Sequence, residues 1–195
     1  MSSSTSTPAE LGAALEDAFG YRFLDPSLAI LALTHSSQSN ERGREDNYER
    51  LEFLGDAVLG LVASQWLYRT FPRAPEGELA KLKSFLVSTP VLADFARSVD
   101  LGSHLRLGVG EERSGGREKI SLLADGVEAL FGAIYLEGGL DAALPVVEKV
   151  VESGYARRHQ IQHHDAKTRL QELAQGAGME LPVYELVGES GPDHN

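Results

Sequence analysis

The stretch that decides the fold is NYERLEFLGDAVL, residues 47–59. It opens a long apolar segment in which Glu52 and Asp56 are the only charged residues between Leu51 and Tyr68. Apolar side chains at helical spacing predict a helix over 48–71. A separation of four residues puts both carboxylates on one face of that helix, with side-chain origins roughly 5–6 Å apart.

A second stretch, KISLLADGVEALFGAIYLEGG at 119–139, repeats the pattern with Asp125 and Glu128 as the only charges between Ile120 and Leu136. If the two helices pack side by side, four carboxylates meet in one pocket. Unpaired buried carboxylates cost several kcal/mol each, so either these acids face solvent or they share a cation. Oxygen ligands without histidine or cysteine favour a hard ion, Mg²⁺ or Mn²⁺.

The remainder of residues 9–160 predicts an all-α domain, and Asp25-Pro26 reads as an N-cap followed by proline at the first helical position. Residues 36–46 are polar and predict a turn, and glycines frame a loop between 108 and 116. Helices are predicted at 10–19, 26–35, 48–71, 76–87, 90–99, 118–136 and 141–158.

Composition narrows the class of protein. The 195 residues are 42% hydrophobic and 24% charged, which predicts a soluble globular chain, and the lack of cysteine excludes disulfides and thiolate metal sites. Residues 1–8 predict a disordered tail without a secretion signal. The most apolar stretch, 57–68, is too short to span a bilayer, so we expect a cytoplasmic protein and no membrane partner. The net charge of −11 argues against RNA binding unless a local basic patch or metal ions offset it.

Several motifs together identify a resemblance. The two acidic stretches, ALTHSS at 32–37, FPRAPEGELAKLKSFLVS at 71–88 and LRLGVGEERSGG at 105–116 are similar in order and spacing to bacterial ribonuclease III. One departure is Ser36, where that family usually has arginine. The resemblance implies the helical endonuclease fold of that family.

The resemblance also implies an activity. Members of the family hydrolyse double-stranded RNA with Mg²⁺, work as homodimers with one active site per subunit, leave 5′-phosphate and 3′-hydroxyl ends, and process ribosomal RNA precursors and messenger RNA. By this resemblance the metal ligands are Glu52, Asp125 and Glu128, the catalytic residues are Asp56 and Glu128, and Glu49 and Glu76 help to bind substrate.

Other side chains have two interpretations each. Phe53, with Arg50, lies on the helix that forms the dimer interface in this family, although Phe53 can equally pack in the core. Arg113, Arg117 and Lys119 are candidates for phosphate contacts because of their charge and loop position. His35 is expected to be structural, in the turn after its helix.

Residues 161–195 change character. DAKTRLQELAQ at 165–175 and YELVGESGPDH at 184–194 resemble the start of an α+β double-stranded-RNA-binding domain, preceded by a linker. The later strands and basic helix of that domain do not follow, so we expect a truncated module that is not stable alone. By resemblance, Thr168, Gln171 and Glu172 would face one minor groove and His194 a second. For Gln171 and Glu172, a solvated helix face is the alternative.

Two rival functions fit part of the pattern. One is a duplex-RNA binder that has lost catalysis, which the presence of all four acids disfavours. The other is a structural helical dimer whose carboxylates are merely solvated. Cleavage of duplex RNA with Mg²⁺ but not with chelator distinguishes the enzyme from both rivals.

Overall fold

The computed structural model describes residues 8–43, 46–158, 174–175 and 179. Helices dominate this part of the chain, joined by one isolated parallel β-bridge between Thr34 and Arg106. The all-α class predicted for the first domain is confirmed. The elements are α1 (Pro8–Phe19), α2 (Pro26–Ala32), α3 (Ser36–Glu41), α4 (Glu49–Thr70), α5 (Glu76–Leu86), α6 (Thr89–Ser98), α7 (Leu101–His104), α8 (Val109–Arg113), the 3-10 turn η1 (Gly116–Glu118) and α9 (Ile120–Ala156).

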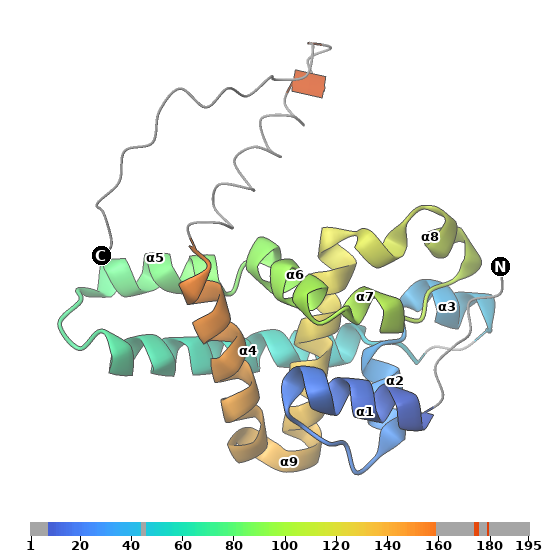
Figure 1. The fold of residues 1–195 in the computed structure, drawn as a ribbon, viewed down its shortest axis with the longest axis horizontal. Coiled ribbons are helices and arrows are strands. Elements are labelled where there is room, and N and C mark those ends of the chain that lie inside the picture. The colour runs from blue at the N-terminus through green and yellow to red at the C-terminus, as the bar shows by residue number, and fades with distance from the viewer. Residues whose placement is uncertain (1–7, 44–45, 159–173, 176–178, 180–195) are drawn as a thin grey trace. The chain divides into compact units, whose positions relative to one another are not determined.

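The longest helix, α9, forms the centre of the fold (Figure 1). It is bent at Gly139, whose φ of 71° lies in the left-handed region that favours glycine. Two limbs result, and Figure 1 shows them meeting at the foot of the view. The sequence predicted two helices that are interrupted at Gly138-Gly139, and the bend lies there.

α9 is also long and apolar enough, by length and composition alone, to cross a membrane, with a mean hydropathy of 1.4 in its most apolar window. The expectation that no stretch of the chain is apolar over a sufficient length to span a bilayer is therefore wrong by this measure. Burial explains the apolarity of α9: it packs against α4 and α6, and side chains such as Phe131 and Val147 have no exposed surface. The core helix of a soluble protein commonly has this composition.

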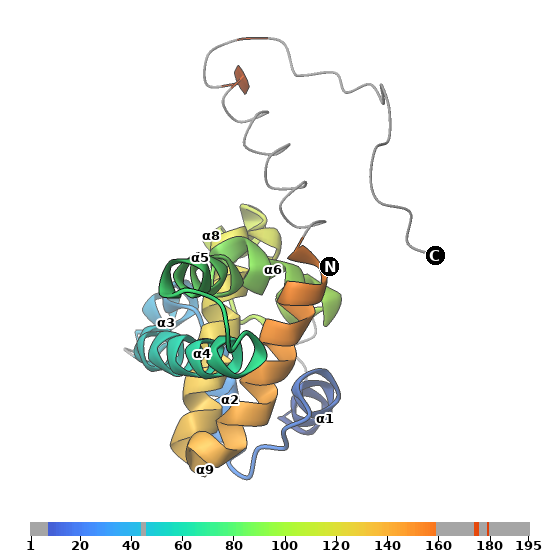
Figure 2. The same cartoon turned by 90° about the vertical axis from the view of Figure 1, so that its left-hand side faces the viewer.

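α4 crosses both limbs of α9, and Figure 2 shows it nearly end-on beside them. Towards its C-terminal end, Trp66 Nε1 donates to Glu152 at 3.1 Å and Arg69 pairs with Glu148 at 3.3 Å, both on the second limb. Its N-terminal half meets the first limb instead. The acidic side chains singled out in the sequence lie where the N-terminal half of α4 crosses the first limb of α9.

Residues 36–41 form helix α3, where the sequence predicted only a turn. The His35 imidazole caps this helix by accepting from the Ser37 N–H at 3.1 Å, and Ser39 Oγ donates to the Asp46 carbonyl at 2.5 Å. Polar residues alone give no helical periodicity, so these contacts define α3. The glycine-framed loop likewise contains two short helical turns, α8 and η1.

The chain divides into two compact units, residues 1–157 and 158–195. The predicted boundary after residue 160 stays a prediction. All four residues expected to bind RNA in the second unit, Thr168, Gln171, Glu172 and His194, lie outside the described residues.

Candidate metal centre and catalytic site

The site is built on a close crossing of two helix backbones. A Cβ added at Gly55 of α4 would overlap the carbonyl oxygen of Glu128 in α9, and one added at Gly132 of α9 would overlap the carbonyl oxygen of Leu51. Only glycine permits such an approach. It brings the acidic face of α4 directly against the acidic face of α9.

Three carboxylates meet at this crossing. Glu52, Asp125 and Glu128 each offer one oxygen atom, and these oxygens all lie within 4.8 Å of one another. All three side chains are half-buried, whereas Asp56, one turn further along α4, is exposed. The helices do pack side by side, but three of the four carboxylates expected to meet form the cluster. Asp56 lies beside it and acts on Glu128 through its charge.

The like charges and partial burial change the acidity of the cluster. Burial, followed by the charges of Asp56, Asp125 and Glu52, raises the pKa of Glu128 to about 8. Burial, followed by the charges of Asp125, Glu49 and Asp56, also raises the pKa of Glu52. Near neutral pH the protein alone favours a proton in this cluster, and a divalent cation is the natural replacement for it.

Asp125 differs because a tyrosine supports it. The Tyr48 side chain is only 2% exposed, and its hydroxyl donates to Asp125 Oδ2 at 3.3 Å. Burial raises the pKa of Asp125, while this hydrogen bond and the nearby His35 oppose the rise. The His35 and Tyr48 rings lie 5.6 Å apart, so the residue that caps α3 also packs against this support. No sequence pattern singled out Tyr48, because a tyrosine at a helix start usually packs in the core.

Comparison with known proteins decides the family. Residues 25–153 match a family described as ribonuclease-III-like. The ribonuclease 3 of Oleidesulfovibrio alaskensis is 49% identical over 182 residues, which cover 92% of this chain and 80% of that protein. The chain belongs to the ribonuclease III family. As a member it is an enzyme, a hydrolase of the endoribonuclease class.

Two further ribonuclease III relatives define the extent of the similarity. The ribonuclease 3 of Streptomyces coelicolor is 49% identical over 181 residues, 92% of this chain but 65% of that protein. The nuclease domain of ribonuclease III from Campylobacter jejuni, solved in a study of flexibility in its dimer-forming region, superposes with a TM-score of 0.69 and 42% identity. That match covers 73% of this chain and 97% of the solved one.

The remaining acidic candidates lie in different places. Glu49 is exposed at the first residue of α4, and its charge contributes to the raised pKa of Glu52. Glu76 begins α5, beyond the far end of α4. The 18 residues from Glu52 to Thr70 correspond to ~27 Å of helix, so within one chain Glu76 does not join the ribonuclease III carboxylate cluster.

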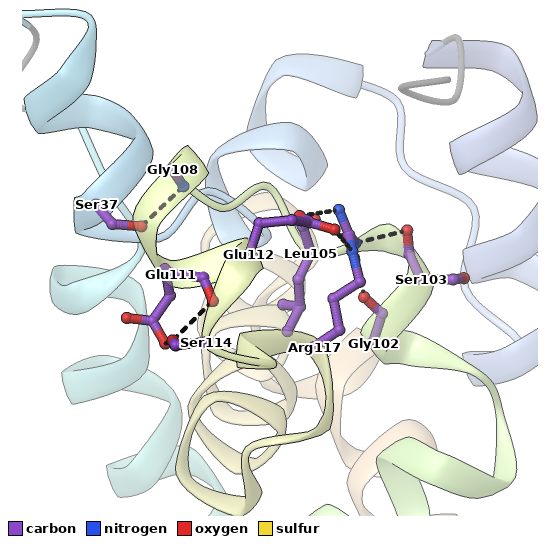
Figure 3. A network of polar contacts seen from close by, with 9 residues as sticks. All are labelled: Ser37, Gly102, Ser103, Leu105, Gly108, Glu111, Glu112, Ser114 and Arg117. Atoms are coloured by element: carbon purple, nitrogen blue, oxygen red, sulfur yellow. Dashed lines mark hydrogen bonds and ion pairs between the residues drawn. The ribbon is translucent and has the colours of Figure 1, made fainter. Parts of the chain in front are cut away.

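The side chain of Arg117 is committed to the fold (Figure 3). Arg117 Nη1 donates to the carbonyls of Gly102, Ser103 and Leu105 at 2.8–3.0 Å, and its Nε and Nη2 bind the Glu112 carboxylate at 2.6 and 2.7 Å. The hypothesis that Arg117 contacts phosphate is therefore wrong, because its nitrogens are already engaged.

The other two basic candidates in this loop differ from Arg117. Lys119 binds Glu111 at 2.5 Å and Ser114 at 3.0 Å, which ties it to its own loop. Arg113 is exposed. Of the three, Arg113 is the one that the described contacts leave available to a ligand.

Phe53 is not a core residue. Its side chain is 81% exposed on α4, and Leu136 of α9 is 57% exposed. Both line a hollow of about 860 Å³, which is bordered by apolar side chains such as Leu28 and Leu54 and by polar ones such as Glu49 and Arg50. The core-packing interpretation of Phe53 is therefore wrong, and an apolar surface lies on the same helix as the acidic cluster.

Proposed function

We propose that the chain hydrolyses phosphodiester bonds in double-stranded RNA with a divalent ion, Mg²⁺, for which Mn²⁺ can substitute. The observation that carries the proposal is the carboxylate cluster, which packs three acidic oxygens within 4.8 Å of one another. Such a set without any nitrogen or sulfur ligand suits a hard cation that keeps several waters.

Glu52, Asp125 and Glu128 would hold the ion, and Tyr48 would keep Asp125 oriented towards it. A bound Mg²⁺ would supply Lewis acidity and lower the pKa of a coordinated water. Asp56 is exposed beside the cluster, where its carboxylate can orient the attacking water and accept its proton.

In the reaction, the water oxygen forms a bond to phosphorus and the bond between phosphorus and the 3′-oxygen breaks. The departing 3′-oxygen takes up a proton, so the products are a 5′-phosphate and a 3′-hydroxyl. Glu128 is proposed to be the residue on which the chemistry depends most. Burial and the charges of three neighbouring acids disfavour its carboxylate form, and a bound cation would stabilise that form.

The enzyme is proposed to act as a homodimer. An exposed Phe53 beside an apolar hollow is unfavourable in water and suits a second copy that presents the same pair of features. Two copies supply two sites, one for each strand of a duplex. Glu49 at the start of α4 and Glu76 of α5 would line the channel in which the RNA lies, Glu76 from a position distant from its own chain's cluster.

The substrate is proposed to be structured RNA in the cytoplasm, including ribosomal RNA precursors and messenger RNA. A duplex is recognised mainly through its phosphates and 2′-hydroxyls. Thr168, Gln171, Glu172 and His194 are proposed to contribute minor-groove contacts. Metal ions at the acidic cluster would offset part of the charge of −11 that otherwise repels RNA.

The test is cleavage of long duplex RNA in Mg²⁺ and in chelator, with Glu128→Gln as the variant and Glu16→Gln, an exposed glutamate of α1, as control. We expect metal-dependent cutting by the parent and the control. Glu128→Gln should lower the rate by roughly 10³-fold or more and retain RNA binding. Normal cutting by Glu128→Gln would refute the site. RNA binding by the parent without cleavage would favour a non-catalytic binder, and neither activity would favour a structural dimer.

A further inference from the structure

A second hollow, of about 410 Å³, lies between α2, α3 and the segment that pairs with Thr34. Its polar lining includes Gln38, Arg42, Asp46 and Arg106, and none of the acidic cluster contributes to it. We call it the Arg42–Arg106 pocket. It is separate from the apolar hollow beside Phe53, although Leu31 and Asp46 line both.

Within the part of the chain that the structure describes, the two arginines of this pocket have no acidic partner. Among residues 8–43 and 46–158, neither Arg42 nor Arg106 has a carboxylate oxygen within 4.0 Å, although the chain as a whole has 29 acids and 18 lysines and arginines. Burial, followed by the charge of Arg42, lowers the pKa of Arg106. Arg106 is half-buried and Arg42 is exposed at the rim of the hollow, and their like charges repel each other. An anion bound between the two guanidinium groups would remove this repulsion.

The other lining groups define which donors remain available. Ser27 Oγ donates to Asp25, Thr34 Oγ1 to the Ile30 carbonyl and Ser39 Oγ to the Asp46 carbonyl. These hydroxyls can therefore only accept from a ligand. Among the described lining residues, the donors left for a ligand are the two guanidinium groups and the Gln38 amide, and Asp46 contributes an opposing negative charge.

We propose that the Arg42–Arg106 pocket binds a phosphomonoester group or free phosphate. Guanidinium forks match phosphate oxygens in pairs. A monoester carries a charge of about −1.5 to −2 near pH 7. It therefore neutralises two arginines more completely than a backbone diester, which carries a single negative charge. A proton on the ligand could be donated to one of the accepting hydroxyls. The site takes no part in the proposed metal chemistry, so it does not rest on the proposed function.

The test is calorimetric titration with inorganic phosphate and with a nucleoside 5′-monophosphate, in chelator and at constant ionic strength. Without metal, the carboxylate cluster repels the same probes. We expect saturable binding with a dissociation constant on the order of 1 mM. Arg42→Gln and Arg106→Gln should each weaken it at least about tenfold, while Arg97→Gln, an exposed arginine of α6, should not. Absence of saturation, or an equal loss in Arg97→Gln, would overturn the proposal.

Thermal unfolding separates a ligand site from a structural one. In phosphate-free buffer we expect Arg42→Gln and Arg106→Gln to melt at the parent temperature or above it, because the substitution removes a repulsion. Phosphate should then stabilise the parent but not these two variants. A clear loss of stability without phosphate would show that the arginines serve the fold and would refute the proposal.

The natural source of the monoester is decided with short RNA duplexes that differ only in a 5′-phosphate or 5′-hydroxyl end, again in chelator. Tighter binding of the phosphorylated duplex by the parent, lost in Arg106→Gln, assigns the pocket to RNA ends. Equal binding of both duplexes, with mononucleotide binding retained, assigns it to a small phosphorylated molecule.

Discussion

Two groups of part-buried charges in one domain differ in whether other protein groups satisfy them. One is the carboxylate cluster, and the other is the Arg117 node, which is Arg117 with Glu112 and the carbonyls that it binds. Arg117 has every nitrogen engaged, by three carbonyls and by Glu112 (Figure 3). Glu52, Asp125 and Glu128 face one another, and among the described side chains Tyr48 donates a hydrogen bond to Asp125. Buried charge that the chain satisfies itself stabilises the fold, whereas charge left unsatisfied marks a place for a ligand.

The largest expected effect comes from removing the guanidinium group of Arg117, whose charge is satisfied within the protein. Arg117→Met keeps the aliphatic stem but leaves three carbonyls and the Glu112 carboxylate without their donor. We expect a loss of about 3 kcal/mol in the free energy of unfolding, measured with urea. Arg113→Met, exposed in the same loop, should change it by less than about 0.5 kcal/mol. Equal effects of the two substitutions would mean that the Arg117 node does not hold the loop.

The next effect comes from forcing the two acidic faces apart. Gly132→Ala places a methyl group against the Leu51 carbonyl, so α4 and α9 must separate. We expect a loss of about 2 kcal/mol in unfolding free energy and, in folded protein, a drop in RNA cleavage because the carboxylates no longer meet. The control is Gly12→Ala in α1, where an added Cβ meets nothing within 4 Å. It should be neutral or stabilising, and normal cleavage by Gly132→Ala would show that the close crossing is dispensable.

The smallest expected effect is the pH dependence of stability that arises from Glu128 in the carboxylate cluster. The pKa of Glu128 is raised from 4.5 to about 8 in the fold. Its contribution to stability is complete below pH 4.5 and is lost as the pH rises through about 8. In chelator, the melting temperature of Glu128→Gln should therefore exceed that of the parent by a margin that grows between pH 5.5 and 8.5, on the order of a few degrees.

Mg²⁺ provides the control for that measurement. It should stabilise the parent more than Glu128→Gln, because only the parent retains the full set of acidic oxygens. Parallel melting curves at every pH, with or without Mg²⁺, would mean that Glu128 is not under electrostatic strain.

Much of the fold could be predicted from the spacing of apolar residues and from the prolines and glycines at helix ends. The apolar run of α4, the proline after Asp25 and the paired glycines at 138 and 139 each predicted an element end that the structure has within a few residues. α3 did not follow, because its polar residues are held helical by the His35 cap and by the bond from Ser39 to the Asp46 carbonyl. The phosphate role given to Arg117 was wrong for the same reason, since its partners are carbonyls 12–15 residues away in the chain.

The sequence by itself determined that Glu52 shares a helical face with Asp56, and Asp125 with Glu128, because helical spacing is a local property of the chain. Whether the two faces meet was decided only by tertiary structure, through the contact of Gly55 and Gly132 with the opposite backbone. The same holds for the exposure of Phe53 and for the pairing of Arg42 with Arg106. Burial and charge–charge distance depend on which segments pack together, and no local pattern specifies that.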